Sequence, residues 1–226
     1  MFLTKDNQIK WNQIGLAAGV VVILIFAGIL WFDKPLFGFL REFDCRAWWY
    51  FDQIFSAKNW IFVAAVAAAF FCVKKCVKTD CSFFKCVNKV NVRDFLCGFF
   101  EKTKASNAFL IFYSVLGAGL LVGVLKVLIG RARPIFYEAL GMTGFFPPST
   151  EWAFNSMPSG HTAVSFAGLV MIGMLAPRFK PLTWTLAIFI GMSRVAYGAH
   201  WPTDVIFGAF IGMVVADLVK GILRKS

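Results

Sequence analysis

Long apolar runs alternate with short polar and basic segments along the whole chain. Several of these runs approach the length that an α-helix needs to cross the hydrocarbon core of a bilayer, about 20 residues. The pattern predicts an all-α, polytopic membrane protein with six transmembrane helices, at residues 14–31, 60–77, 108–129, 158–176, 182–199 and 204–223.

The composition supports a membrane environment. Hydrophobic residues make up 59% of the chain and charged residues 15%, whereas ordinary soluble domains carry about 25% charged residues. The net charge of +11 comes from basic residues that cluster beside apolar runs, which favours anionic phospholipids as partners and disfavours nucleic acid. A cleaved signal peptide is the alternative for residues 14–31, but no small-x-small cleavage site follows them, so a retained helix is predicted.

Two connecting segments have their own character. Residues 32–58 carry mixed charge and many aromatic side chains, as expected of a segment in the membrane interface. Residues 74–104 combine eight lysines and arginines with interspersed phenylalanines, which predicts a basic helix lying on the membrane surface.

Most of the six cysteines fall in or next to this basic segment. They lack C-x-x-C spacing and nearby histidines, so a zinc site is disfavoured. Reduced thiols on a cytoplasmic surface fit the basic flanks better. The five clustered cysteines are Cys72, Cys76, Cys81, Cys86 and Cys97, while Cys45 stands alone.

The distribution of basic residues predicts the orientation. With six spans both termini lie on one side, and the connections on that side collect most of the lysines and arginines. Positive charge stays cytoplasmic, so both termini are predicted to face the cytoplasm. Within one integral membrane domain, residues 1–107 would form an N-terminal part with two helices and the basic linker, and residues 108–226 a four-helix catalytic part.

The first stretch that contains candidate binding or catalytic residues is residues 126–134. Lys126 is followed, after six residues, by Arg133 and Pro134. Snorkelling of a long side chain to the interface would explain Lys126 alone. Snorkelling does not explain why Arg131, Arg133 and Pro134 occur at the same end of the predicted span.

The second stretch, residues 158–161, reads Pro-Ser-Gly-His at the start of a predicted span. Ser159 is a plausible N-cap, and Gly160 allows a ligand to approach the backbone closely. Free N–H groups at a helix start favour an anion. A merely capped helix start is the structural alternative.

The third stretch, residues 193–204, places Arg194, His200 and Asp204 in otherwise apolar sequence. The guanidinium of Arg194 offers a planar fork of donors to a phosphate. Asp204 follows His200 by four residues, a spacing at which a carboxylate can reach an imidazole on a helical turn. A buried ion pair that fixes helix packing is the alternative, but His161 and His200 are the only histidines in the chain and both fall in these stretches.

The order and spacing of the three stretches resemble the signature motifs of the type 2 phosphatidic acid phosphatase (PAP2) superfamily, over roughly residues 108–223. The resemblance implies His200 as the nucleophile of a phosphohistidine intermediate, Asp204 as the group that orients it, and His161 as the general acid. Phosphate would be bound by Lys126, Arg133, Ser159, Gly160 and Arg194. No cluster of carboxylates or histidines is left over for a metal, so catalysis without a cofactor is expected.

The resemblance implies a bacterial inner-membrane lipid phosphatase. Because the termini are predicted to be cytoplasmic, the motifs at the opposite end of the spans would face the periplasm. Undecaprenyl diphosphate, phosphatidic acid, phosphatidylglycerol phosphate and the 1-phosphate of lipid A are all suitable substrates. Residues 144–161 are similar to small bacterial members, including those of the lipid A 1-phosphatase type, and Phe145, Phe146 and Trp152 are candidates for a lid. A phosphotransferase with the same site, a vanadate-dependent haloperoxidase and a non-catalytic lipid-binding or transport protein are the alternatives.

Overall fold

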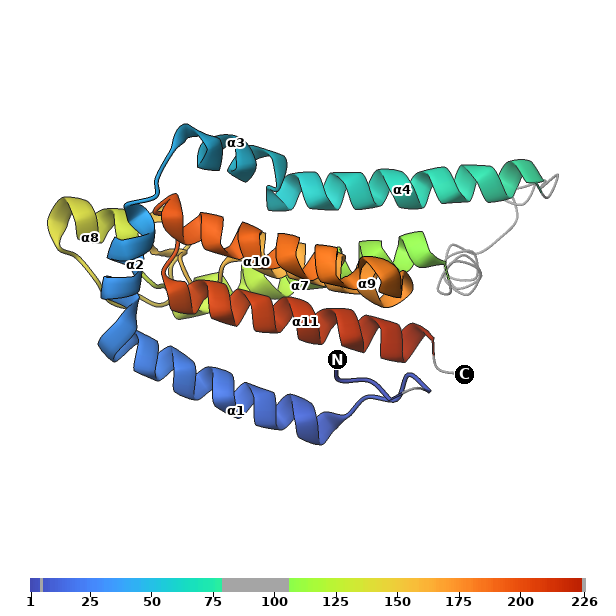
Figure 1. Cartoon of the computed structure of the whole chain (residues 1–226), viewed down its shortest axis with the longest axis horizontal. Helices are drawn as coiled ribbons and strands as arrows, with labels where there is room; N and C mark the ends of the chain where they lie inside the picture. Colours follow the sequence, from blue (N-terminus) through green and yellow to red (C-terminus); the bar gives the residue numbers. More distant parts are fainter. Residues whose placement is uncertain (5, 79–105, 225–226) are drawn as a thin grey trace.

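The computed structural model describes residues 1–4, 6–78 and 106–224, and helices make up the regular structure of these residues (Figure 1). The N-terminal elements are α1 (Trp11–Ala27), the π-helical turn η1 (Gly28–Phe32), α2 (Asp33–Arg41), α3 (Arg46–Ile54) and α4 (Ala57–Lys78). The remaining elements are α7 (Asn107–Ile129), α8 (Pro134–Leu140), η2 (Trp152–Phe154), α9 (Gly160–Leu175), η3 (Pro177–Phe179), α10 (Lys180–Ala196) and α11 (Pro202–Leu223).

Helix α9 forms the centre of the fold and packs against α7, α10 and α11. Its side chains join a core that includes Leu110, Phe166, Met171 and Ile190. Small residues let the central helices approach closely. A Cβ atom at Gly212 of α11 would lie only 2.4 Å from the carbonyl oxygen of Ala163 in α9.

Within the described residues, four helical segments are long and apolar enough to cross a membrane: Trp11–Arg41, Arg46–Cys72, Asn107–Ile129 and Pro202–Leu223. Helix α9 is apolar but shorter, and most of its residues are buried in the bundle. Helix α10 has 17 residues and contains Arg194. The chain is therefore a membrane protein with several apolar helices, while the full count of six spans stays a prediction.

The segment predicted to be interfacial, residues 32–58, is mostly helical. Helix α1 continues through the π-helical turn into α2, and α3 precedes α4. Helix α2 packs against α10 and α11, and α3 packs against α10 (Figure 1). The predicted basic surface helix and most of the clustered cysteines lie largely in residues 79–105, outside the described residues.

The N-terminal residues lie beside the C-terminal part of α11, toward one end of the bundle (Figure 1). The backbone N–H of Phe2 donates to Asp217 of α11 over 2.7 Å, and Asn7 donates to the carbonyl oxygen of Arg224 over 3.2 Å. The end of α7, the start of α9 and the start of α11 lie at the other end. The three motifs therefore gather at the end of the bundle opposite to the termini.

Candidate active site

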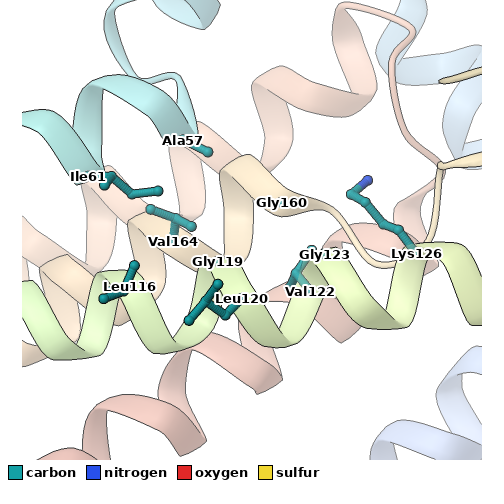
Figure 2. A pocket seen from close by; sticks show the side chains of 10 residues that line it. All are labelled: Ala57, Ile61, Leu116, Gly119, Leu120, Val122, Gly123, Lys126, Gly160 and Val164. Carbon is teal, nitrogen blue, oxygen red and sulfur yellow. The ribbon is translucent and has the colours of Figure 1, made fainter. Parts of the chain in front are cut away.

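Lys126 and Gly160 bring the first two motifs into contact. Lys126 belongs to the last turn of α7, and Gly130, which directly follows the helix, lies in the left-handed region with a φ of 59°. Gly160 begins α9, and a Cβ atom placed there would lie 3.6 Å from Cε of Lys126. The stem of the lysine thus passes beside the start of α9, as Figure 2 shows.

Backbone carbonyl groups fix the cations of the first motif. Nζ of Lys126 donates to the carbonyl oxygen of Asn155 over 2.6 Å. The guanidinium of Arg133 donates to the carbonyl oxygens of Trp152, Ala199 and Asn155 over 2.9, 2.9 and 3.2 Å, and it stacks over the Trp152 ring at 4.3 Å. Burial lowers the pKa of Arg133 to about 10, so the group stays charged at neutral pH.

His200 lies in the turn between α10 and α11 and is 2% exposed. Its backbone N–H donates to the carbonyl oxygen of Arg194 over 3.2 Å, which joins the two halves of the third motif. Burial, followed by the positive charges of Arg133, Lys126 and Arg194, lowers the pKa of His200 well below its usual 6.5. The nearby His161 also acts electrostatically on His200 and lowers its pKa.

Asp204 is held mainly by groups other than His200. Its Oδ2 atom lies 3.7 Å from Nδ1 of His200, which is longer than a hydrogen bond, and Nδ1 has no hydrogen-bond partner among the described residues. The carboxylate accepts instead from Arg131 over 2.6 Å, from Ser156 over 2.5 Å and from the backbone N–H of Trp201 over 2.9 Å. The direct bond expected from the four-residue spacing is therefore absent, because these donors occupy the carboxylate.

Arg131 connects Asp204 to the N-terminal half of the chain. Its second terminal nitrogen donates to Asp33 of α2 over 2.6 Å, and Thr203 donates to the same carboxylate from its hydroxyl over 2.7 Å and its backbone N–H over 3.0 Å. Burial would lower the pKa of Arg131, but the carboxylates of Asp204 and Asp33 outweigh burial and raise it. The sequence motifs place Arg131 at this end of the span but give it no role, and they do not indicate Asp33 as a residue of the site.

Arg194 and His161 share a partner that no motif indicates. Nε2 of His161 lies 3.3 Å from Oδ1 of Asp52 in α3, and Nη1 of Arg194 forms an ion pair with the same oxygen. Arg194 is 4% exposed, and its Nε atom makes no hydrogen bond among the described residues. A buried guanidinium with an unsatisfied Nε donor suits an anionic ligand.

Ser159 occupies the N-cap position of α9, as predicted, but its side chain does not cap the backbone. Its hydroxyl oxygen accepts from Thr162 over 2.9 Å, and its backbone N–H donates to the carbonyl oxygen of Asp204 over 2.9 Å. The side chain is fully buried. A phosphate-binding role for Ser159 stays a prediction.

An apolar cavity leads along the bundle to this site. It measures about 310 Å³ and lies between α4, α7 and α9. Figure 2 shows Lys126 at one end of the row of lining residues. Leu120, in the wall of the cavity, is 65% exposed, so the cavity lies along the outer face of α7. The lining residues are Ala57, Ile61, Leu116, Gly119, Leu120, Val122, Gly123, Lys126, Gly160 and Val164.

The aromatic residues suggested for a lid lie at the same end. Phe145, Phe146 and Trp152 are exposed by 44%, 43% and 59%. The Phe145 ring lies 5.6 Å from the guanidinium carbon of Arg131. Phe145 and Trp152 thus pack beside cations, whereas Phe146 packs on Phe154 with ring centroids 4.7 Å apart. The contact of these side chains with a substrate stays a prediction.

Two histidines and four cationic side chains lie at one end of this apolar helical bundle, which defines a helical membrane protein with a binding site for an anion. Residues 107–226 match the PAP2 superfamily. Since the match covers more than half of the 226 residues, the chain belongs to the PAP2 superfamily, which confirms the family predicted from the motifs.

Individual relatives match over parts of their length. Lipid A 1-phosphatase of Rhizobium johnstonii is 42% identical over 110 residues, which are 47% of this chain and 45% of that protein. Phosphatidylglycerophosphatase B of Bacillus subtilis is 30% identical over 117 residues, which are 47% of this chain and 53% of that protein. The chain thus spans about half the length of these relatives.

A solved structure shares the fold. The crystal structure of a transmembrane PAP2 type phosphatidylglycerolphosphate phosphatase from Bacillus subtilis superposes with a TM-score of 0.52 at 21% identity, over 92% of this chain and 94% of that one.

Proposed function

We propose that the protein is a membrane lipid phosphatase that removes a phosphate from a lipid headgroup through a phosphohistidine intermediate. The observation that carries this proposal is the buried His200, which the charges of Arg133, Lys126 and Arg194 surround. Phosphoryl transfer depends mostly on positioning and on neutralisation of the phosphate oxygens. A neutral imidazole among fixed cations provides a nucleophile and a site for those oxygens together.

The reaction proceeds in two steps. In the first, the neutral imidazole of His200 attacks phosphorus, the bond from phosphorus to the lipid oxygen breaks, and His161 gives a proton to that oxygen. In the second, water attacks the phosphohistidine, His161 takes the proton from the water, and His200 leaves as phosphate is released. The lowered pKa of His200 keeps its imidazole neutral and ready to attack at neutral pH.

The apolar cavity supports a lipid as the substrate. Its walls are apolar except for Lys126 at the end near Gly160, so an acyl or prenyl chain would lie along α4 and α7 with its phosphate beside the lysine. Similarity to a lipid A 1-phosphatase and to a phosphatidylglycerophosphatase supports phosphate monoesters as the first substrates to test, with prenyl diphosphates as the alternative.

The location and cofactor requirement complete the proposal. The protein would span the bacterial inner membrane six times with both termini in the cytoplasm, because basic residues gather on the side of the termini. The site, at the opposite end, would then face the periplasm. Catalysis would rest on residues 108–226 and need no divalent ion, so EDTA should leave activity intact.

Release of phosphate by the purified protein tests the proposal. A panel of lipid A 1-phosphate, phosphatidic acid, phosphatidylglycerol phosphate and undecaprenyl diphosphate, with and without EDTA, should give release from at least one lipid. The His200→Ala chain should lose this release while still binding the lipid. Release that persists in His200→Ala would contradict the mechanism, and binding without release by the unmodified chain would favour a lipid-binding protein.

A further inference from the structure

Asp52 is the acidic residue of α3, a helix that also carries four consecutive aromatic side chains and packs against α10. Its neighbour Phe51 packs on Phe55, with ring centroids 4.6 Å apart, and lies 6.4 Å from the Phe189 ring of α10. Trp48 lies 6.0 Å from the same ring. These contacts hold α3 against α10, so the position of Asp52 follows from packed aromatic side chains.

One oxygen of Asp52 contacts two groups of the site. Oδ1 lies 3.3 Å from Nε2 of His161 and pairs with Nη1 of Arg194. The Asp52 side chain is 13% exposed, so water screens these contacts only weakly. A carboxylate on one imidazole nitrogen fixes the orientation of the ring and leaves the other nitrogen for the reaction.

The charges around His161 give this carboxylate a function. Lys126 and Arg133 act electrostatically on the His161 ring as like charges, and they would repel the ring when it carries the proton to be donated. The neighbouring carboxylates Asp33 and Asp204 both pair with Arg131. Within the described residues, Asp52 is the carboxylate that lies within ion-pairing distance of the His161 ring.

We propose that Asp52 is a positioning residue of the reaction: it orients His161 so that the ring delivers its proton to the leaving lipid oxygen. The inference rests on the proposed function and adds to it a residue outside the three motifs. Asp52 itself does not touch the reacting atoms. Through α3, the N-terminal part of the chain would take part in proton delivery.

The inference predicts that the effect of removing Asp52 depends on the leaving group. An alkyl phosphate needs a proton on its leaving oxygen, whereas p-nitrophenolate leaves without one. Asp52→Asn should lower kcat/KM for a short-chain phosphatidic acid by about 10–100-fold, as loss of a partner that orients an imidazole does elsewhere, and should change kcat/KM for p-nitrophenyl phosphate much less. In a His161→Ala background, Asp52→Asn should cause no further loss on phosphatidic acid, because the two residues act as a unit.

Three further variants provide controls. Asp44→Asn removes the same charge from an exposed residue that pairs with Arg41 and should leave both substrates unaffected. Asp52→Glu should recover part of the lost activity. If the Asp52→Asn protein does not fold, Asp52→Ser repeats the test.

The outcomes separate clearly. Equal losses on the two substrates, or a further loss in the His161→Ala background, would mean that Asp52 supports only phosphate binding or the fold. A rise in kcat/KM would mean that the carboxylate blocks the site. Either result would overturn the inference while the proposed function stands, whereas absence of phosphate release from every substrate by the unmodified chain would overturn the function itself.

Discussion

Arg131 holds Asp204 at 2.6 Å, whereas the imidazole of His200 lies 3.7 Å from the same carboxylate. The acidic residue of the third motif is thus fixed by a guanidinium from the first motif. The same guanidinium reaches Asp33 in α2. A single buried cation therefore joins the N-terminal helices to the turn that carries His200.

Removal of this cation should destabilise the protein strongly. Arg131→Gln would leave Asp33 and Asp204 buried without their positive partner, and breaking a buried ion pair from one side costs about 3–5 kcal/mol. The melting temperature of the detergent-solubilised protein should fall well below that of the unmodified chain. Arg46→Gln, at an exposed position of α3, should leave it unchanged; equal melting temperatures for the two variants would contradict the role of Arg131.

The pKa of His200 should be measurable directly. His161→Ala leaves His200 as the only histidine of the chain, so histidine-specific isotope labelling yields a single imidazole for NMR titration. Burial and nearby positive charges disfavour the protonated ring. As the pH falls, the ring should therefore stay neutral past 6.5 and take up a proton only well below it. The denatured chain, titrating near the unperturbed value of about 6.5, is the control; a folded-state midpoint at or above that value would contradict the account.

Filling the apolar cavity should impair long-chain substrates selectively. A Cβ atom at Gly123 would meet no other atom within 4 Å, so Gly123→Leu would place its side chain in open space along the lining. The kcat/KM for a long-chain lipid phosphate should fall at least about tenfold, the scale of hydrophobic pocket contacts, while that for a short-chain analogue should change little. Gly15→Leu in α1, where the added Cβ atom also meets nothing within 4 Å, is the matched control. Equal effects of Gly123→Leu on both chain lengths would exclude the cavity as the chain-binding site.

Much of the helical layout could be predicted from the sequence because long apolar runs have few alternatives to a helix in a membrane. The runs predicted at residues 108–129 and 204–223 correspond closely to α7 and α11. Motif spacing also located Lys126, Arg133, Arg194 and the two histidines, which the structure brings to one end of the bundle.

The partners of these residues could not be predicted in the same way. Asp52 reaches His161 and Arg194 across more than a hundred residues, and Asp33 reaches Arg131 across 98. Such pairings depend on how helices pack, which hydrophobic periodicity does not specify. One signal was present: a charge at membrane depth needs a partner or a function, and Asp33 directly follows an apolar run.

Trapping of the intermediate tests the central claim most directly. The protein would be mixed with a lipid substrate radiolabelled in its phosphate, quenched within one turnover, and analysed for label bound to each histidine-containing peptide. We expect acid-labile, base-stable label on the peptide that contains His200, and none in the His200→Ala chain. Label on another residue, or rapid phosphate release by the unmodified chain with no labelled protein at any time, would contradict the account.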